Sequence, residues 1–250
     1  MVSPASPSWN ALLTLADAWY CRREELSADR LDQRFLEWLT PHERVHRQKL
    51  RTPTLRHAYL ATRVLCRVAL SHYTHVDPAT WAFTAGKHGK PAIARPAAFR
   101  AVRFNISHTD GLIVCVVTRA GEIGIDVEET SREVDIAQIA RHFFSTDEQG
   151  HLSTLSSKDR KSRFFELWVL KEAYLKGRGM GLSWSPDLFS IRWDSKTNPL
   201  SIGNWQLALH RPTARHVAAT AIRQRRNAPT IPVRWRDGHT LFETDIPIEG

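Results

Sequence analysis

The sequence has 250 residues, enough for one large domain or for two small lobes that each bury a modest core. Hydrophobic residues make up 42% and charged residues 24% of the chain, and these values exclude a wholly disordered protein. The formal net charge is +9, and between Arg44 and Arg103 twelve Lys or Arg residues accompany a single acid, Asp77, which indicates an anionic partner or a solvated basic face.

Apolar residues at helical spacing predict two helices between residues 30 and 73, one before Pro41 and one from Leu55 onward. The segment WAFTAGKHGKPAI then predicts a short strand, a Gly-rich loop and the start of another strand. The segment VRFNISHTDGLIVCVVTRAGEIGIDVEE predicts three strands joined by tight turns. We interpret its RAGE turn as the midpoint of the chain.

The second half predicts three helices, near residues 133–143, 145–155 and 164–182. It also predicts three strand-like pieces, near residues 188–193, 204–210 and 216–223. Because each half offers helices and about three strands, we expect an α+β fold with two similar lobes, each a small three-stranded sheet with helices.

Three regions follow from this division: an N-terminal lobe at 1–119, a C-terminal lobe at 120–227 and an extension at 228–250. The first lobe carries most of the basic stretch, and the second carries the acids and the Lys-Glu helix described below. The tail from Asn227 contains three prolines together with Arg234 and Arg236, a composition that predicts loose packing.

Neither a membrane span nor a leader is expected. The longest apolar run, GLIVCVVT, is far shorter than the roughly 20 residues that a membrane helix needs, and the N-terminus has no basic segment before its apolar part. We therefore expect a cytoplasmic protein. Cys21, Cys66 and Cys115 are odd in number, widely separated and without metal-ligand spacing, so we expect neither disulfides nor a zinc site and interpret them as buried thiols.

Two acids share one face of a predicted strand. In EIGIDVEE, alternation places Ile125 and Val127 on one side and Asp126 and Glu128 on the other. Neighbouring carboxylates repel each other, so they are partly protonated or hold a cation, and their hard oxygen ligands suit Mg²⁺. Acids on an ordinary solvated strand face are the alternative interpretation.

The helix at 164–182 offers a third acid and two lysines. Trp168, Glu172 and Lys176 lie on one helical face, and Lys171 lies about 100° around the helix. Glu172 can complete a metal site, and lysines beside it would neutralise the charge of a substrate phosphate. A surface pair between Glu172 and Lys176 explains the spacing as well, but not the flanking aromatic residues.

Two short segments could bind phosphate through backbone N–H groups and cations: GKHGKP at 86–91 and NISH at 105–108. A plain turn and a structural His108 explain them equally well, and neither has the spacing of a P-loop or a Rossmann fingerprint.

Taken together, five segments occur in an order and at gaps that resemble the 4′-phosphopantetheinyl transferases: GKP at 89–91, FNISH at 104–108, GIDVE at 124–128, FFSTDE at 143–148 and WVLKEAYLK at 168–176. The resemblance runs from about Pro41 to Leu182. The Trp-x-x-Lys-Glu-Ala form resembles the surfactin-type branch, whose members are pseudo-twofold monomers, rather than the short trimeric synthases.

The resemblance implies that phosphopantetheine moves from coenzyme A to a serine of an apo-acyl or peptidyl carrier protein, with Mg²⁺ as the cofactor and adenosine 3′,5′-bisphosphate as the product. Carrier proteins are typically acidic, which would match the basic stretch. The implied metal ligands are Asp126, Glu128 and Glu172.

The same resemblance implies roles for residues around the coenzyme. Lys171 and Lys176 would hold the pyrophosphate and pantetheine side, and Glu148 would help to deprotonate the carrier serine. The nucleotide pocket would include Lys90, Ser107 and His108, with the 3′-phosphate near Arg44, Arg47 and Arg56. The resemblance gives no role to the additional Lys87.

Two other functions would use some of the same residues. A metal-dependent nuclease would also use paired acids on a basic protein, but nucleases with a Glu-x-Lys strand need a lysine two residues past an acid, and DVEET has none. A non-catalytic nucleic-acid-binding module fits the isoelectric point near 9.9 but leaves the carboxylates unexplained. We therefore expect a transferase that binds neither nucleic acid nor membrane.

Overall fold

The computed structural model describes residues 7–86, 88–181, 185–191, 200–225 and 228–243. Contacts within the chain define two compact units. Unit 1 comprises the chain up to Thr84, Pro91–Ala120 and the chain from Ile231 onward, and unit 2 comprises Ala85–Lys90 and Gly121–Thr230. The α+β class predicted from the sequence is confirmed.

Unit 1 contains a four-stranded sheet, a two-stranded ribbon and helices. Its helices are α1 (Pro7–Ala11), α2 (Ala28–Phe35), α3 (Pro41–Lys49), α4 (Pro53–Thr74) and α8 (Thr240–Glu243). Its strands are β1 (Ala16–Arg22), β2 (Ala82–Ala85, the last residue counted with unit 2), β3 (Pro91–Arg95), β4 (Arg103–Thr109), β5 (Leu112–Thr118) and β10 (Val233–Asp237). Short 3₁₀ helices are η1 (Arg23–Glu25), η2 (Leu36–Trp38), η3 (Pro78–Thr80) and η4 (Ala97–Phe99).

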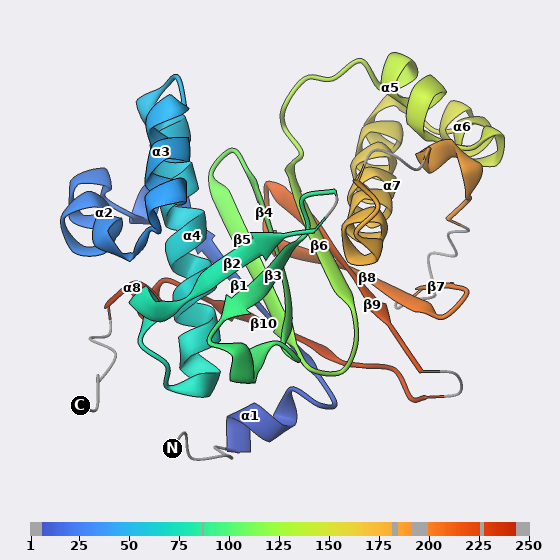
Figure 1. Cartoon of the computed structure of the whole chain (residues 1–250). Helices are drawn as coiled ribbons and strands as arrows, with labels where there is room; N and C mark the ends of the chain where they lie inside the picture. Colours follow the sequence, from blue (N-terminus) through green and yellow to red (C-terminus); the bar gives the residue numbers. More distant parts are fainter. Residues whose placement is uncertain (1–6, 87, 182–184, 192–199, 226–227, 244–250) are drawn as a thin grey trace. The chain divides into compact units, whose positions relative to one another are not determined.

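The long helix α4 packs against the sheet of unit 1, whose strand order is β10-β1-β5-β4 (Figure 1). Thr52 caps the helix by accepting a hydrogen bond from the Leu55 N–H, and Pro53 occupies its first turn, where no N–H is needed. Apolar residues of α4, among them Leu60 and Val64, share one core with residues of β5. The sequence predicted two helices between residues 30 and 73, but the structure has three, because the basic and polar segment at 41–49 forms the additional helix α3.

The loose packing predicted for the C-terminal tail is wrong for its described part. Residues Val233–Asp237 form β10, which pairs in parallel with β1. The fully buried carboxylate of Asp17 accepts hydrogen bonds from Arg234 at 2.6 and 2.7 Å and from the Tyr73 hydroxyl at 2.6 Å. The composition of the tail alone could not indicate this packing, because the acid that binds Arg234 lies 217 positions earlier in the chain.

Unit 2 consists of a second four-stranded sheet, antiparallel throughout in the order β6-β9-β8-β7, and helices. Its helices are α5 (Ile136–Phe143), α6 (Thr146–Ser153), α7 (Ser157–Arg178) and the 3₁₀ helix η6 (Pro186–Leu188). Its strands are β6 (Ile123–Glu129), β7 (Leu200–Ile202), β8 (Trp205–Thr213) and β9 (His216–Arg223).

The elements predicted for this half are confirmed near 133–143, 145–155, 204–210 and 216–223. The strand expected near 188–193 is wrong where it is described, because residues 186–188 form η6 and 189–191 are irregular; the rest lies outside the described residues. Each unit has a sheet of four strands, so the predicted three-stranded sheets are corrected. Within the described ranges, no helix combines the length and apolar character that crossing a bilayer requires.

Two glycines allow α7 to lie directly on β6 (Figure 1). A Cβ atom at Gly124 of β6 would overlap the carbonyl oxygen of Ala173 and lie 2.8 Å from the Cα of Gly177. A Cβ at Gly177 would lie 2.6 Å from the Trp205 ring. The helix and strand backbones are therefore in contact at this point, which fixes the side chains one turn away on the helix.

We expect Gly124→Ala to lower the free energy of unfolding by about 3 kcal/mol, because the added methyl group meets backbone that cannot rotate away. Gly150→Ala in α6 is the matched control, since open space surrounds that position and alanine favours a helix by about 0.5 to 1 kcal/mol. Urea unfolding of both variants measures the difference. Equal stability of the two would contradict the close contact of β6 and α7.

Candidate active site

Gly124, Asp126 and Glu128 occupy alternate positions of β6 and so lie on the face that α7 covers. Asp126 is only 4% exposed, so the alternative of an ordinary solvated strand face is wrong for it. The Nζ of Lys176 lies 2.6 Å from Asp126 Oδ1. The indole N–H of Trp168 donates to Glu128 at 3.1 Å.

These two contacts confirm the helical face predicted from the sequence. Trp168 and Lys176 reach successive acids of β6, and Glu172 lies between them on the same face of α7. Burial raises the pKa of Glu172, the negative charge of Asp126 raises it further, and Lys176 opposes both. Glu172 and Asp126 are therefore close enough to repel each other in a partly dry environment, which a bound cation would relieve.

Glu128 is held from two sides. Besides the bond from Trp168, it forms an ion pair at 3.1 Å with Arg132, which follows it by four residues in the chain. The three carboxylates offer only oxygen ligands, and oxygen ligands are those that Mg²⁺ takes in proteins. The donor set thus fits a hard divalent cation.

Lys171 points away from this cluster and forms a buried ion pair with Glu148. The two charged groups are 2.7 Å apart, and Lys171 and Glu148 are 2% and 4% exposed. Lys171 also donates to the carbonyl oxygens of Pro186 at 2.7 Å and Phe189 at 2.8 Å. An ammonium group has three hydrogens, so each has an acceptor.

The partners of Glu148 are equally complete. Its carboxylate accepts from the backbone N–H groups of Ser145 and Ile191, both at 2.8 Å, as well as from Lys171. Burial lowers the pKa of Lys171, and the charge of Glu148 opposes this effect. Ser145 and Glu148 form a capping box at the start of α6, and the Ser-x-x-Glu spacing is a signal in the sequence that Glu148 has a local structural partner.

Lys90 joins the GKP turn to the end of α7. Its Nζ lies 2.6 Å from the carbonyl oxygen of Gly177 and 2.8 Å from Glu122 Oε2. A cation at this position neutralises the negative end of the helix dipole. Lys87 lies outside the described residues.

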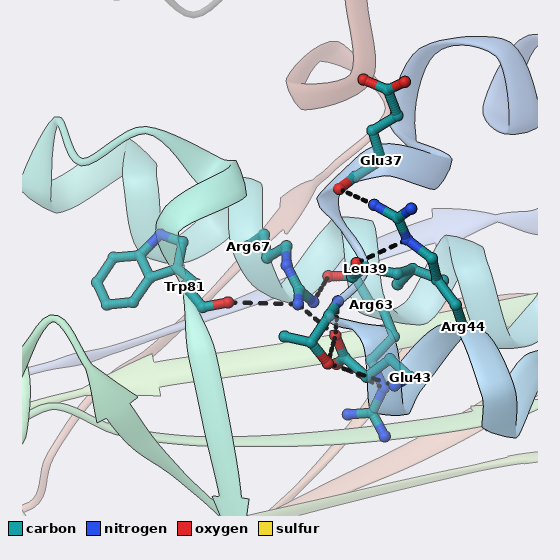
Figure 2. A network of polar contacts seen from close by, with 8 residues as sticks. Glu37, Leu39, Glu43, Arg44, Arg63, Arg67 and Trp81 are labelled. Atoms are coloured by element: carbon teal, nitrogen blue, oxygen red, sulfur yellow. Dashed lines mark hydrogen bonds and ion pairs between the residues drawn. The ribbon is translucent and has the colours of Figure 1, made fainter.

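The other predicted coenzyme residues belong to unit 1, whereas the carboxylates belong to unit 2. Ser107 is buried and His108 is exposed, both on β4. The guanidinium of Arg44 donates to the carbonyl oxygens of Leu39 at 3.0 Å and Glu37 at 2.9 Å (Figure 2).

The remaining two predicted arginines also contact the protein itself. Arg47 forms a bond to each oxygen of Asp32, at 2.6 and 2.8 Å, and donates from Nε to the Arg56 carbonyl. Arg56 in turn donates from Nε to the Leu50 carbonyl at 3.0 Å. These contacts order the segments that flank α3.

Glu43 neutralises part of the positive charge of the basic stretch, and its contacts are drawn in Figure 2. Its carboxylate lies 2.6 Å from Arg67, which is fully buried, and 3.6 Å from Arg63. Burial would raise the pKa of Glu43, but Arg67 holds it below its usual value. Glu43 immediately precedes Arg44, so a count that begins at Arg44 omits the acid that neutralises two of the basic residues.

Comparison with known proteins places the chain in a family. A model described as the 4′-phosphopantetheinyl transferase superfamily matches residues 122–225, and one described as 4′-phosphopantetheinyl transferase, N-terminal, matches 27–120. The 4′-phosphopantetheinyl transferase Sfp of Bacillus subtilis (strain 168) is 32% identical over 162 residues, which cover 64% of this chain and 69% of Sfp. The chain belongs to the 4′-phosphopantetheinyl transferase family.

Other transferases of this family match regions of different length. The 4′-phosphopantetheinyl transferase HetI of Nostoc sp. is 34% identical over 131 residues, covering 52% of this chain and 55% of HetI. A phosphopantetheinyl transferase of Thraustochytrium sp. is 29% identical over 170 residues, covering 64% of this chain and 59% of that protein. The chain thus spans between about half and two thirds of the length of these relatives.

We expect Lys171→Met to lower the free energy of unfolding by about 3 to 5 kcal/mol, because it leaves the Glu148 carboxylate buried without its cation. Lys158→Met, at an exposed position of the same helix, is the control and should change stability little. The double variant Lys171→Met/Glu148→Gln should recover part of the loss. Thermal or urea unfolding measures all three, and similar losses for Lys171→Met and Lys158→Met would exclude a stabilising pair.

Proposed function

We propose that this protein transfers the 4′-phosphopantetheine group from coenzyme A to a serine of an apo-acyl or peptidyl carrier protein, releasing adenosine 3′,5′-bisphosphate. The observation that carries the proposal is the arrangement of Asp126, Glu172 and Lys176, in which a cation and two repelling carboxylates share one partly dry site. Family membership supplies the reaction class.

Asp126, Glu128 and Glu172 are the proposed ligands of Mg²⁺. When bound, the ion would neutralise the pyrophosphate of coenzyme A and the charge that develops on its oxygens. The carboxylates of β6 and α7 would hold it, and the contact of the two backbones at Gly124 keeps them at a fixed separation.

The reaction needs a proton acceptor and stabilisation of the leaving oxygen. The serine oxygen of the carrier forms a bond to the phosphorus that bears pantetheine, and the bond from that phosphorus to the bridging oxygen of adenosine bisphosphate breaks. Lys176, held by Asp126, offers a preorganised cation to the oxygens that gain charge. The proposed acceptor of the serine proton is Glu148.

The roles that the resemblance implies for Lys171 and Glu148 require their ion pair to open, because both groups have complete sets of buried partners. The double variant Lys171→Met/Glu148→Gln separates the two possibilities. If the transfer rate recovers together with stability in the double variant, the ion pair serves only to stabilise the fold. If the double variant is stable but its transfer rate stays low, the two residues act in the reaction.

For coenzyme A we propose contacts with Lys90, Ser107 and His108, and with Arg44, Arg47 and Arg56 at the 3′-phosphate. The carrier is proposed to be acidic, to match the net charge of +9, and the enzyme to be a cytoplasmic monomer of the surfactin type. A pseudo-twofold relation between the units is proposed as well. Its support is that each unit combines a four-stranded sheet with one helix of 22 residues, α4 or α7.

The direct test is to incubate the protein with coenzyme A, Mg²⁺ and apo-carrier proteins of fatty-acid, polyketide and nonribosomal peptide synthesis, and to weigh each carrier by intact mass spectrometry. We expect one phosphopantetheine to be added to at least one carrier, and none when EDTA removes the metal. Unmodified serine in all carriers would refute the proposal. A nuclease would instead cleave added DNA or RNA under the same conditions.

We expect Asp126→Asn, Glu128→Gln and Glu172→Gln each to reduce the transfer rate by about 100-fold or more while the protein stays folded. Each substitution removes one negatively charged ligand of the proposed Mg²⁺ ion, which stabilises the charge that develops in the reaction. Glu133→Gln, which also removes one negative charge but at a 94% exposed side chain, is the matched control. Rates are measured at saturating Mg²⁺, and folding by circular dichroism. Rates like that of the control in all three variants would end the metal-site assignment.

If Arg44, Arg47 and Arg56 bind the 3′-phosphate, replacing any one by alanine should weaken coenzyme A binding by about 10-fold or more, the value of one charge-assisted hydrogen bond. Binding of dephospho-coenzyme A should change little. The ratio of the two dissociation constants within each variant cancels general effects on the fold, and exposed Arg51→Ala is the control. Equal losses for both ligands would reassign these arginines to the pyrophosphate or to the carrier protein.

A further inference from the structure

Three potential metal ligands meet in unit 1, far apart in the sequence. The Sγ of buried Cys21, a carboxylate oxygen of Glu25 and a ring nitrogen of His239 all lie within 4.8 Å of one another. Cys21 is near the end of β1, Glu25 ends η1, and His239 lies between β10 and α8. The spacing of the cysteines did not predict a zinc site. Spacing reveals only ligands that are near one another in the sequence, whereas His239 and Cys21 lie near opposite ends of the chain.

The backbone, rather than the three side chains, determines this arrangement. Parallel pairing sets Asp237 of β10 opposite Tyr20 of β1, and the Gly238 N–H donates to the Tyr20 carbonyl at 2.7 Å. The His239 N–H donates to the Asp237 carboxylate at 2.9 Å. A Cβ at Gly238 would lie 3.1 Å from the Tyr20 carbonyl oxygen, so glycine allows the chain to turn close to β1. His239 is therefore brought beside Cys21 by main-chain contacts.

Glu25 is oriented toward the same point. Arg22 donates to its Oε1 at 2.9 Å, while Oε2 lies 4.0 Å from His239 Nδ1. Glu25 and His239 also line a pocket of about 70 Å³ together with Leu31, Phe35 and Phe242. An ion that enters this pocket meets two of the three side chains.

We propose that Cys21, Glu25 and His239 bind one Zn²⁺ ion. Thiolate, imidazole and carboxylate are the three ligand types that zinc uses, and tetrahedral bonds of about 2.0 to 2.3 Å put ligand atoms about 3.5 Å apart. The ligand atoms, now within 4.8 Å of one another, would have to approach each other by up to about 1.3 Å to reach that distance. Sulfur does not suit Mg²⁺, so the site differs in metal from the carboxylates of β6 and α7.

The bound ion would connect the end of β1 to the segment that follows β10, and so stabilise the pairing of the C-terminal strand. Burial raises the pKa of the Cys21 thiol to about 12, so the entering ion displaces the thiol proton. The proposal is independent of the transfer reaction, because no residue of this site belongs to the proposed active site.

The test is a titration of the full chain with Co²⁺, whose bond to a thiolate gives an intense charge-transfer absorption that oxygen ligands do not give. We expect one Co²⁺ per chain with this absorption, and displacement of cobalt by Zn²⁺. Cys21→Ser should abolish the absorption. Glu25→Gln and His239→Ala should weaken cobalt binding by about tenfold or more, since even partners outside the ligand shell are worth that much.

Two control variants should keep the absorption: Cys66→Ala, which removes another buried thiol, and Asp126→Asn, which removes a carboxylate of unit 2. Zn²⁺ should also raise the melting temperature of the wild type but not of His239→Ala, a substitution at a partly exposed position. Absence of thiolate absorption in the wild type, its persistence in Cys21→Ser, or unchanged cobalt affinity in His239→Ala would each overturn the proposal.

Discussion

The direct contact between the backbones of β6 and α7 determines the geometry of the candidate active site. Gly124 and Gly177 lack the side chains that would separate the two elements. The positions after Gly124 on the same face of the strand are Asp126 and Glu128, and the helix places Glu172 and Lys176 over them. A larger residue at Gly124 would move the helix and separate its charges from those of the strand, so the site and the packing of unit 2 have one cause.

Buried charges occur as pairs in both units. Lys171 binds Glu148 and Arg67 binds Glu43, both pairs being buried, while the buried carboxylate of Asp17 binds the partly exposed Arg234, in each case at 2.6 or 2.7 Å. A buried charge without a partner is costly, so each pair fixes the position of the segments that carry it. The net charge of +9 consequently overstates the cationic surface available to a ligand, because several basic residues serve the interior.

Local geometry explains which features the sequence could predict. Strand alternation gave the shared face of Asp126 and Glu128, and helical spacing gave that of Trp168, Glu172 and Lys176, because both depend on neighbours within a few residues. The partner of Lys171 and the pairing of β10 with β1 depend on contacts between distant segments, which no periodicity records. Composition was misleading for the same reason, because it gave no sign that Asp17, far away in the sequence, binds Arg234 and Arg236.

We propose that β6 and α7 form one cation site that also holds the pyrophosphate of coenzyme A. Manganese replaces magnesium at oxygen sites, and its unpaired electrons relax nearby phosphorus nuclei with a steep dependence on distance. Phosphorus-31 relaxation of coenzyme A bound to the full chain with Mn²⁺ therefore measures this arrangement. We expect strong relaxation of both pyrophosphate signals, weaker relaxation of the 3′-phosphate, and loss of the effect in Glu172→Gln. Strongest relaxation at the 3′-phosphate, or no change in Glu172→Gln, would contradict the claim.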